Sequence, residues 1–371
     1  AATLILIALI TTLLYDIPKV KHKHVIAVAI NTQHHQHTQA TNHTGEEGGR
    51  DVWVPHLCPH YKVIRRDERS TSLKPTQATL SQDAIFFIQT SCHTALTRRE
   101  ACAVESAAHH HPHRPIFVFM TYPAINHTHP LIQVLSRLSN VRLAWLNLDQ
   151  VFADEPLRTW HRERLWMMNE NRMSTVVSDA ARVELLRRYG GTYLDLDALT
   201  LRPLPNTTNY LARIHDRLVS NAIISVTSGH PLMKMVADNI PSVFDATSCC
   251  SIGPELITRQ LHRLCPDNVT IPASVGPNET ETCGDVTIWP SKMFIPIHYG
   301  YLRHQLQSMF REGEGLGPTF IRNTEAFSLH LFNSVSHRRS VSLDEDSILK
   351  EVAIRNCPRI VELLRKYRTH L

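Results

Sequence analysis

Short apolar segments alternate with helical patterns between residues 84 and 148, and this order restricts the fold more than any other feature. Branched and aromatic residues, typical of buried strands, fill three runs at 84–90, 116–120 and 141–148. The segments between them, 97–108 and 129–139, have the character of helices. Because strand and helix alternate three times, the sequence predicts an α/β domain with a mostly parallel sheet and right-handed crossovers.

The first 80 residues differ in composition from the rest of the chain. Residues 1–15 are apolar and uncharged, and lysines follow at positions 19, 21 and 23. A full membrane span needs about 20 apolar residues. Since the chain opens on Ala, we expect 1–23 to be a truncated anchor with its flank, while a signal peptide and a buried helix are the alternatives. Residues 24–80, polar in their middle part, predict a stem, and 81–371 a folded domain.

Eight cysteines and five N-x-[ST] sequons favour an oxidising, secretory setting. The sequons start at Asn42, Asn126, Asn206, Asn268 and Asn278. Cys92 with Cys102, and Cys265 with Cys283, are candidate local disulfides, although spacing does not prove connectivity and free thiols are the alternative. The formal net charge of +5 is small for 371 residues and gives no reason to expect a nucleic-acid partner.

The segment 176–204 carries the clearest chemical signal. Ser178 or Asp179 is expected to cap a helix that ends at Gly190–Gly191, and the strand TYLDLD follows. If this strand is extended, the two carboxylates of its D-x-D point to the same side of the sheet edge.

A D-x-D at the end of a strand is suited to a divalent metal and a phosphate ligand. Mg²⁺ and Mn²⁺ prefer oxygen ligands and often bind substrate phosphates together with one or two carboxylates. In α/β sheets, ligands bind beyond the carboxyl ends of the strands. Asp195 and Asp197 therefore predict a nucleotide-diphosphate site with a metal.

Several motifs occur in one order along the chain. The pattern S-D-x-x-R…Y-G-G-x-Y-x-D-x-D runs from Ser178 to Asp197. Four further segments accompany it: FFIQTS (86–91), CAVESAA (102–108), GPELITR (253–259) and HLFNS (330–334). Together they resemble the DxD-containing α1,4-glycosyltransferases, which include α1,4-galactosyltransferase (globotriaosylceramide synthase), α1,4-N-acetylglucosaminyltransferase and insect α1,4-N-acetylgalactosaminyltransferase. The chain departs from the family pattern at Gln89, Ala222 and Phe332, where Glu, Gly and Trp are usual.

The resemblance implies a GT-A-type, Rossmann-like fold for residues 81–371, with a mostly parallel central sheet and flanking helices. It implies a retaining, metal-dependent enzyme that moves galactose or N-acetylgalactosamine from UDP-galactose or UDP-N-acetylgalactosamine to the terminal sugar of a glycolipid. Mn²⁺ (or Mg²⁺) is the implied cofactor. The implied location is the Golgi membrane, with a single-pass type II anchor and a lumenal catalytic domain.

The resemblance also implies roles for individual residues. Asp195, Asp197 and Asp179 are expected at the catalytic centre, and Asp195, Asp197 and His330 at the metal. The donor and the nearby acceptor side are expected to involve Gln89, Thr90, Ser91, Arg182, Tyr193, Asn221, Gly253, His330 and Asn333.

Three other functions stay open at this point. The first is an α1,4-N-acetylglucosaminyltransferase that acts on glycoprotein glycans. The second is a non-catalytic lumenal binding or chaperone protein on a transferase scaffold, which the intact D-x-D disfavours. The third is a metal-dependent phosphohydrolase, which would need further ligands after neighbouring strands.

Overall fold

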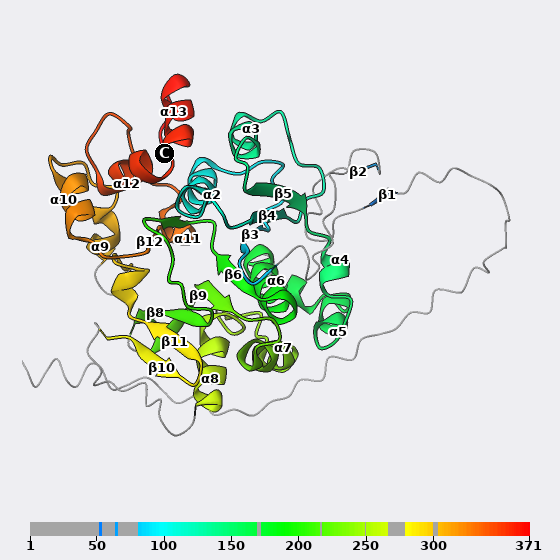
Figure 1. Cartoon of the computed structure of the whole chain (residues 1–371). Helices are drawn as coiled ribbons and strands as arrows, with labels where there is room; N and C mark the ends of the chain where they lie inside the picture. The colour runs from blue at the N-terminus through cyan, green and yellow to red at the C-terminus, as the bar shows by residue number, and fades with distance from the viewer. Residues whose placement is uncertain are drawn as a thin grey trace, which may run out of the picture. The chain divides into compact units, whose positions relative to one another are not determined.

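The computed structural model describes residues 52–53, 64–65, 81–168, 172–215, 217–248, 250–265, 279–299 and 303–371 (Figure 1). All of the described residues belong to one compact unit, Arg50–Leu371. The expected anchor (1–23) lies outside the described residues, as do nearly all of the stem and the residues Asn42, Cys58, Cys249, Asn268 and Asn278. Among the described residues, no helix has the length and apolar character needed to cross a membrane.

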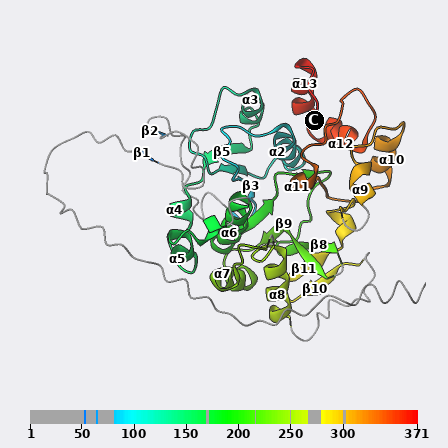
Figure 2. The same ribbon diagram turned by 180° about the vertical axis from the view of Figure 1, so that it is seen from behind.

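The centre of the domain is an eight-stranded mixed sheet in the order β10-β11-β8-β9-β6-β3-β4-β5 (Figures 1 and 2). Within it only β9 and β10 run against the common direction. The strands are β3 (Ile85–Gln89), β4 (Ile116–Met120), β5 (Val141–Trp145), β6 (Gly191–Leu194), β8 (Tyr210–His215), β9 (Leu218–Val226), β10 (Glu281–Cys283) and β11 (Val286–Trp289). The strands predicted at 84–90 and 116–120 are confirmed.

The third predicted strand, 141–148, is too long. β5 ends at Trp145, and a short helix α4 (Leu148–Val151) follows. The Asn147 side chain accepts a hydrogen bond from the backbone N–H of Asp149, so it caps this helix and ends the extended segment.

Helices cover both faces of the sheet. They are α2 (Arg98–His110), α3 (Pro130–Ser136), α5 (Leu157–Arg162), α6 (Met173–Tyr189), α7 (Pro231–Val243), α8 (Pro254–Leu264), α9 (Arg303–Ser308), α10 (Leu316–Asn323), α11 (Asn333–Ser336), α12 (Ile348–Asn356) and α13 (Pro358–Lys366). Short 3₁₀ helices span Leu165–Met168 and Ser291–Met293, and β1 (Val52–Trp53) pairs with β2 (Ile64–Arg65).

Alternate residues of β3 belong to two hydrophobic cores. Phe86 and Ile88 pack with residues of α6, α7 and α8 in one core. Ile85 and Phe87 pack with residues of α2, α3, α12 and α13 in the other. Because successive side chains of a strand point to opposite faces, a strand covered on both sides must be apolar throughout. This explains why the first run of apolar residues is continuous.

Helix α6 begins earlier than the sequence pattern predicts. It starts at Met173, so Ser178 and Asp179 lie inside it and are buried, and neither caps it. The local S-D signal was misleading because these polar side chains bind Arg182 within the helix. The predicted end is confirmed: Gly190 and Gly191 both have positive φ, and a Cβ on Gly190 would lie 2.5 Å from the backbone nitrogen of Ser228.

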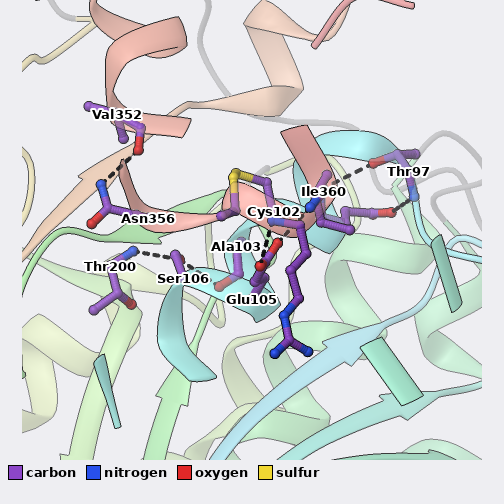
Figure 3. The surroundings of a disulfide bond; sticks show 12 residues. Thr97, Cys102, Ala103, Glu105, Ser106, Thr200, Val352, Asn356 and Ile360 are labelled. Atoms are coloured by element: carbon purple, nitrogen blue, oxygen red, sulfur yellow. Dashed lines mark hydrogen bonds between the residues drawn. A yellow bond between two sulfur atoms is a disulfide. The ribbon is translucent and has the colours of Figure 1, made fainter. Parts of the chain in front are cut away.

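A disulfide between Cys102 and Cys357 fixes the C-terminal helices to α2 (Figure 3). The predicted Cys92–Cys102 pair is therefore wrong, because Cys102 lies within α2 and faces the residue that joins α12 to α13. Glu105 strengthens the same contact by accepting backbone N–H groups of Arg359 and Ile360 at 2.9 and 2.8 Å. The Cys265–Cys283 pair is confirmed, and Cys92 and Cys250 are also disulfide-bonded.

Removing the Cys102–Cys357 bond is expected to lower the free energy of unfolding. The double variant Cys102→Ser/Cys357→Ser frees a loop of 255 residues, and loss of a native disulfide typically costs about 2–5 kcal/mol. Urea unfolding of the two proteins measures the difference. The variant Cys265→Ser/Cys283→Ser opens an 18-residue loop and should lose less. A larger loss in the second variant would contradict the expectation.

Candidate active site

The D-x-D lies in a turn, not in an extended strand. β6 ends at Leu194, and β7 (Ala198–Thr200) begins directly after Asp197. The expectation that both carboxylates extend from one strand is therefore wrong. They converge because β7 pairs with β12 (Ser328–His330), which places His330 opposite Ala198. This pairing brings residues from two distant parts of the chain to one point at the carboxyl end of β6.

Asp195, Asp197 and His330 form a cluster that fits a divalent metal ion. One ligand atom from each lies within 4.8 Å of the others. The His330 Nε2 atom is 3.1 Å from Asp197 Oδ1 and 3.6 Å from Asp195 Oδ2. This nitrogen is buried and faces both carboxylates. A buried imidazole nitrogen together with two carboxylate oxygens is a set of ligand atoms that suits a divalent metal ion.

Each carboxylate of the cluster uses its other oxygen to bind the protein. Asp195 Oδ1 accepts the Tyr193 hydroxyl at 2.6 Å and lies 3.1 Å from Arg182 Nη1. Asp197 Oδ2 accepts the backbone N–H of Asn333 at 2.7 Å. The remaining oxygens, Asp195 Oδ2 and Asp197 Oδ1, are the two that face His330, so the cluster is oriented before any ligand arrives.

Opposite charges hold the cluster ionised. Burial by itself would raise the pKa of Asp195, but Arg182 and His330 outweigh it and lower that pKa to about 2. Burial by itself would lower the pKa of His330, but Asp197 and Asp195 raise it to about 10. At neutral pH the imidazole therefore keeps its proton in the absence of metal, and a metal that binds Nε2 must displace it.

A buried guanidinium organises the side of the cluster toward α6. Arg182 Nη2 lies 3.0 Å from Asp179 Oδ1, and Nη1 donates to the backbone carbonyl of Asn221 at 2.7 Å. The guanidinium carbon lies 4.4 Å from the centre of the Tyr193 ring. Because Arg182 also faces Asp195, it balances two carboxylates at once.

Asp179 is held between α6 and β9. The Asn221 amide donates to Asp179 Oδ1 at 2.8 Å. Burial raises the pKa of Asp179 to about 6, although Arg182 opposes this shift. Gly253 packs against the pair: a Cβ there would lie 2.8 Å from both Asp179 Oδ2 and Asn221 Nδ2. Gly253, the first residue of the GPELITR segment, therefore occupies a position where a larger side chain does not fit.

The variant Gly253→Ala is expected to reduce transfer and stability together. Its Cβ would displace Asp179 or Asn221 and so disturb Arg182, and overpacking of this kind costs about 1–3 kcal/mol. Thermal unfolding and steady-state kinetics measure the two effects. Gly313→Ala provides a control for the substitution itself, because Gly313 has no positive φ and a Cβ there would meet only the flexible side chain of Leu316. Equal behaviour of the two variants would show that the close contact is unimportant.

Gln89, Thr90 and Ser91 lie at the end of β3, which pairs with β6, and so at the same edge of the sheet as the D-x-D. Gln89 donates to Ser91 Oγ, and Thr90 donates to the backbone carbonyl of Ser174 at 2.8 Å. Their hydrogen bonds connect them to each other and to the start of α6, while the other predicted residues form the network around Asp195 and Asp197.

Arg99 is part of this network, and sequence reasoning missed it. Its Nη1 donates to Asn333 Oδ1 at 3.2 Å and to Ser336 Oγ at 3.1 Å, so it fixes the segment that supplies His330. The side chain is buried although it lies in the first turn of α2. A signal was present: Arg99 lies on the same helical face as Cys102 and Ser106, both buried.

Comparison with known proteins gives matches over most of the chain. Residues 97–214 match the family model described as a glycosyltransferase sugar-binding region containing a DXD motif. Residues 225–364 match the alpha 1,4-glycosyltransferase conserved region. The first region contains Asp195 and Asp197, and the second contains His330, so the cluster draws on both.

Two relatives illustrate the similarity. The chain is 28% identical to alpha-1,4-N-acetylglucosaminyltransferase of Homo sapiens over 288 residues, which are 74% of this chain and 78% of the relative. It is also 28% identical to lactosylceramide 4-alpha-galactosyltransferase of Gorilla gorilla gorilla over 291 residues, which are 76% of this chain and 84% of the relative.

Solved structures of glycosyltransferases also match. PaToxG glycosyltransferase is 16% identical, with a TM-score of 0.37 and coverage of 50% of this chain and 70% of that one. An active-site mutant of LgtC is 15% identical, with a TM-score of 0.35 and coverage of 67% and 87%.

The predicted α/β architecture is confirmed: a mostly parallel central sheet with flanking helices. The DXD-containing region implies a divalent metal and a nucleotide-sugar donor in general terms. The two matched regions together cover more than half of the chain. The protein is therefore a glycosyltransferase that carries the regions conserved in DXD-containing and alpha 1,4-glycosyltransferases.

Proposed function

We propose that this enzyme transfers galactose or N-acetylgalactosamine, with retention, from a UDP-sugar to the terminal sugar of a glycolipid. The observation that supports it most is the cluster of Asp195, Asp197 and His330, oriented by Arg182 and Asn333. The similarity to lactosylceramide 4-alpha-galactosyltransferase supports galactose and a glycolipid. The equal identity to alpha-1,4-N-acetylglucosaminyltransferase supports a second candidate, transfer of N-acetylglucosamine to glycoprotein glycans.

Mn²⁺ is the proposed metal, held by Asp195, Asp197 and His330. The imidazole nitrogen among two carboxylates favours Mn²⁺ over Mg²⁺, which prefers oxygen ligands. When bound, the metal would stabilise negative charge on the departing diphosphate. Asp197 is the stronger candidate for a direct ligand, because Arg182 already compensates part of the charge of Asp195.

The other site residues have proposed roles around the donor. Asp179, Arg182, Tyr193 and Asn221 would keep the D-x-D in place beside the donor sugar, with Gly253 next to them toward the acceptor. Asn333 would approach the diphosphate beside His330. Gln89, Thr90 and Ser91 would lie toward the uridine, because they end the neighbouring strand at the same edge.

The proposed location is the Golgi lumen. Residues 81–371 would be the catalytic domain, 1–23 the anchor of a type II membrane protein and 24–80 the stem. Disulfides in the described residues and the exposed sequon asparagines Asn126 and Asn206 support a secretory route.

The full chain, produced through a secretory pathway, tests this proposal. UDP release is measured with Mn²⁺ against UDP-galactose, UDP-N-acetylgalactosamine and UDP-N-acetylglucosamine, with lactosylceramide and with glycoprotein glycans as acceptors. Preferred turnover of a galactose-type donor with lactosylceramide, giving an α1,4 bond by NMR, supports the first candidate. Preference for UDP-N-acetylglucosamine supports the second. A folded, Mn²⁺-loaded protein without any UDP release would indicate a non-catalytic scaffold.

A further inference from the structure

A pocket of about 500 Å³ lies next to the metal cluster, and the proposed chemistry does not yet use it. We call it the Tyr299 pocket; its lining includes Tyr299, Gln307, Phe310, Val335, Ser336 and Arg339. Val335, Ser336 and Arg339 lie in or just after α11, which directly follows the His330 segment. The pocket is thus formed by the part of the chain that supplies the third metal-binding side chain.

One aromatic ring separates the pocket from the metal cluster. The Tyr299 and Phe332 rings have centroids 4.8 Å apart, and the Phe332 and His330 rings have centroids 4.4 Å apart. A ligand that rests on Tyr299 would therefore lie one side chain away from His330. The pocket is therefore close enough to the cluster for one ligand to extend from Tyr299 toward the metal-binding residues.

Arg99 connects the wall of the pocket to the D-x-D. Its guanidinium lies 4.9 Å from the centre of the Phe310 ring and donates to Ser336 Oγ at 3.1 Å. The same guanidinium binds the side chain of Asn333, whose backbone N–H donates to Asp197. Because these contacts are buried and continuous, pocket and cluster form one ordered unit.

The lining of the pocket combines exposed apolar side chains with polar ones. Tyr299 and Val335 are 46% and 56% exposed, and they are two of the four exposed large hydrophobic side chains among the described residues. Gln307 and Arg339 add hydrogen-bonding groups. A sugar matches this pattern because its ring has an apolar C–H face and a hydroxyl edge. An acyl chain matches less well, since it would make no hydrogen bond with the amide or the guanidinium.

We propose that the Tyr299 pocket binds the terminal sugars of the acceptor glycan, with the Tyr299 ring against the apolar face of one sugar. The inference rests on the proposed function, because an acceptor is needed only if a sugar is transferred. The acceptor hydroxyl would then reach the donor past Phe332. Recognition would depend on the saccharide and not on the lipid to which it is attached.

The test separates acceptor binding from donor binding. In the full chain, Tyr299→Ala is expected to raise KM for the lipid-free acceptor methyl β-lactoside by about tenfold, the effect of losing one good aromatic contact. The rise in acceptor KM should clearly exceed any change in donor KM. Tyr299→Phe keeps the ring and should restore most of the affinity. Tyr367→Ala removes another exposed aromatic ring, which caps the C-terminal end of α13, and serves as the matched control.

Three results would overturn the proposal. One is an unchanged KM for methyl β-lactoside in Tyr299→Ala. Another is a parallel rise in donor KM, which would place the donor in the pocket. The third is an effect on lactosylceramide alone, which would indicate a lipid site.

If the protein transfers no sugar at all, the result is different, because the wild type would then release no UDP from any donor. In that case, saturation-transfer NMR with methyl β-lactoside and methyl β-N-acetyllactosaminide tests the pocket directly. Signals in wild type that disappear in Tyr299→Ala would support the saccharide site. The absence of signals in wild type would refute it.

Discussion

Asp197→Asn is expected to reduce metal-dependent transfer by about 10²–10³-fold while the chain still folds. The asparagine keeps the shape of the side chain, and its carbonyl oxygen can still accept the backbone N–H of Asn333. It loses the negative charge that faces His330 at 3.1 Å. A divalent cation bound by Asp197 and His330 would be attracted less strongly without the carboxylate charge. Both the metal affinity and the stabilisation of the leaving diphosphate should therefore fall.

Three measurements check this expectation. Mn²⁺ binding is followed by electron paramagnetic resonance, transfer by kcat/KM for the donor, and folding by thermal unfolding. Asp344→Asn is the matched control, because Asp344 is exposed and lies outside the cluster. Wild-type transfer rates in Asp197→Asn would show that the metal assignment is wrong. Loss of folding in Asp197→Asn, but not in Asp344→Asn, would show that the role of Asp197 is structural.

Local patterns were sufficient to predict strands β3 and β4 and the glycine end of helix α6. The run IFVFM (116–120) forms β4 with the predicted limits. A strand that is covered on both faces is apolar at every position, so the apolar run marks where it begins and ends. Gly190 and Gly191 were predictable because the backbone there needs positive φ. These features depend on neighbours in the sequence.

Features that depend on distant residues were not predictable from such patterns. The partner of Cys102 lies 255 residues away, and only the packing of α12 and α13 on α2 decides it. The turn at the D-x-D depends on the pairing of β7 with β12. His330 and Asn333 came from the family resemblance, whereas Arg99 required the packed structure, because its partners belong to α11.

Arg182→Met is expected to destabilise the protein by about 3–5 kcal/mol, the usual cost of breaking a buried ion pair. Methionine fills much of the volume over the Tyr193 ring but leaves Asp179 and Asp195 without their shared cation. The carboxylate of Asp195 would also lose one of the groups that orient it, so transfer should fall with stability. Urea unfolding measures the first effect, and Arg365→Met, on an exposed surface of α13, is the matched control.

The pH dependence of stability shows how the charges of Asp195 and Asp179 contribute to folding. In wild type the pKa of Asp195 is lowered to about 2, so its ionised form contributes stability above its ordinary pKa of 3.8, and this contribution is lost as pH falls toward 2. Asp179 acts in the opposite direction, because its pKa is raised to about 6 and its ionisation reduces stability as pH rises from about 4 to 6. Without Arg182 both carboxyl groups should bind protons more readily. The stability difference between wild type and Arg182→Met should therefore be largest near neutral pH and shrink in acid.

A double variant separates the lost charge balance from the lost packing. In Arg182→Met/Asp179→Asn one of the uncompensated carboxylates is removed, while the hydrophobic contact of methionine is unchanged. If charge causes the destabilisation, the double variant should be more stable than Arg182→Met at pH 7, and a double-mutant cycle gives the coupling between Arg182 and Asp179. A double variant as unstable as the sum of the single variants would mean that the guanidinium acts through its hydrogen bonds to the Asn221 carbonyl and to Ser178, and not through its charge.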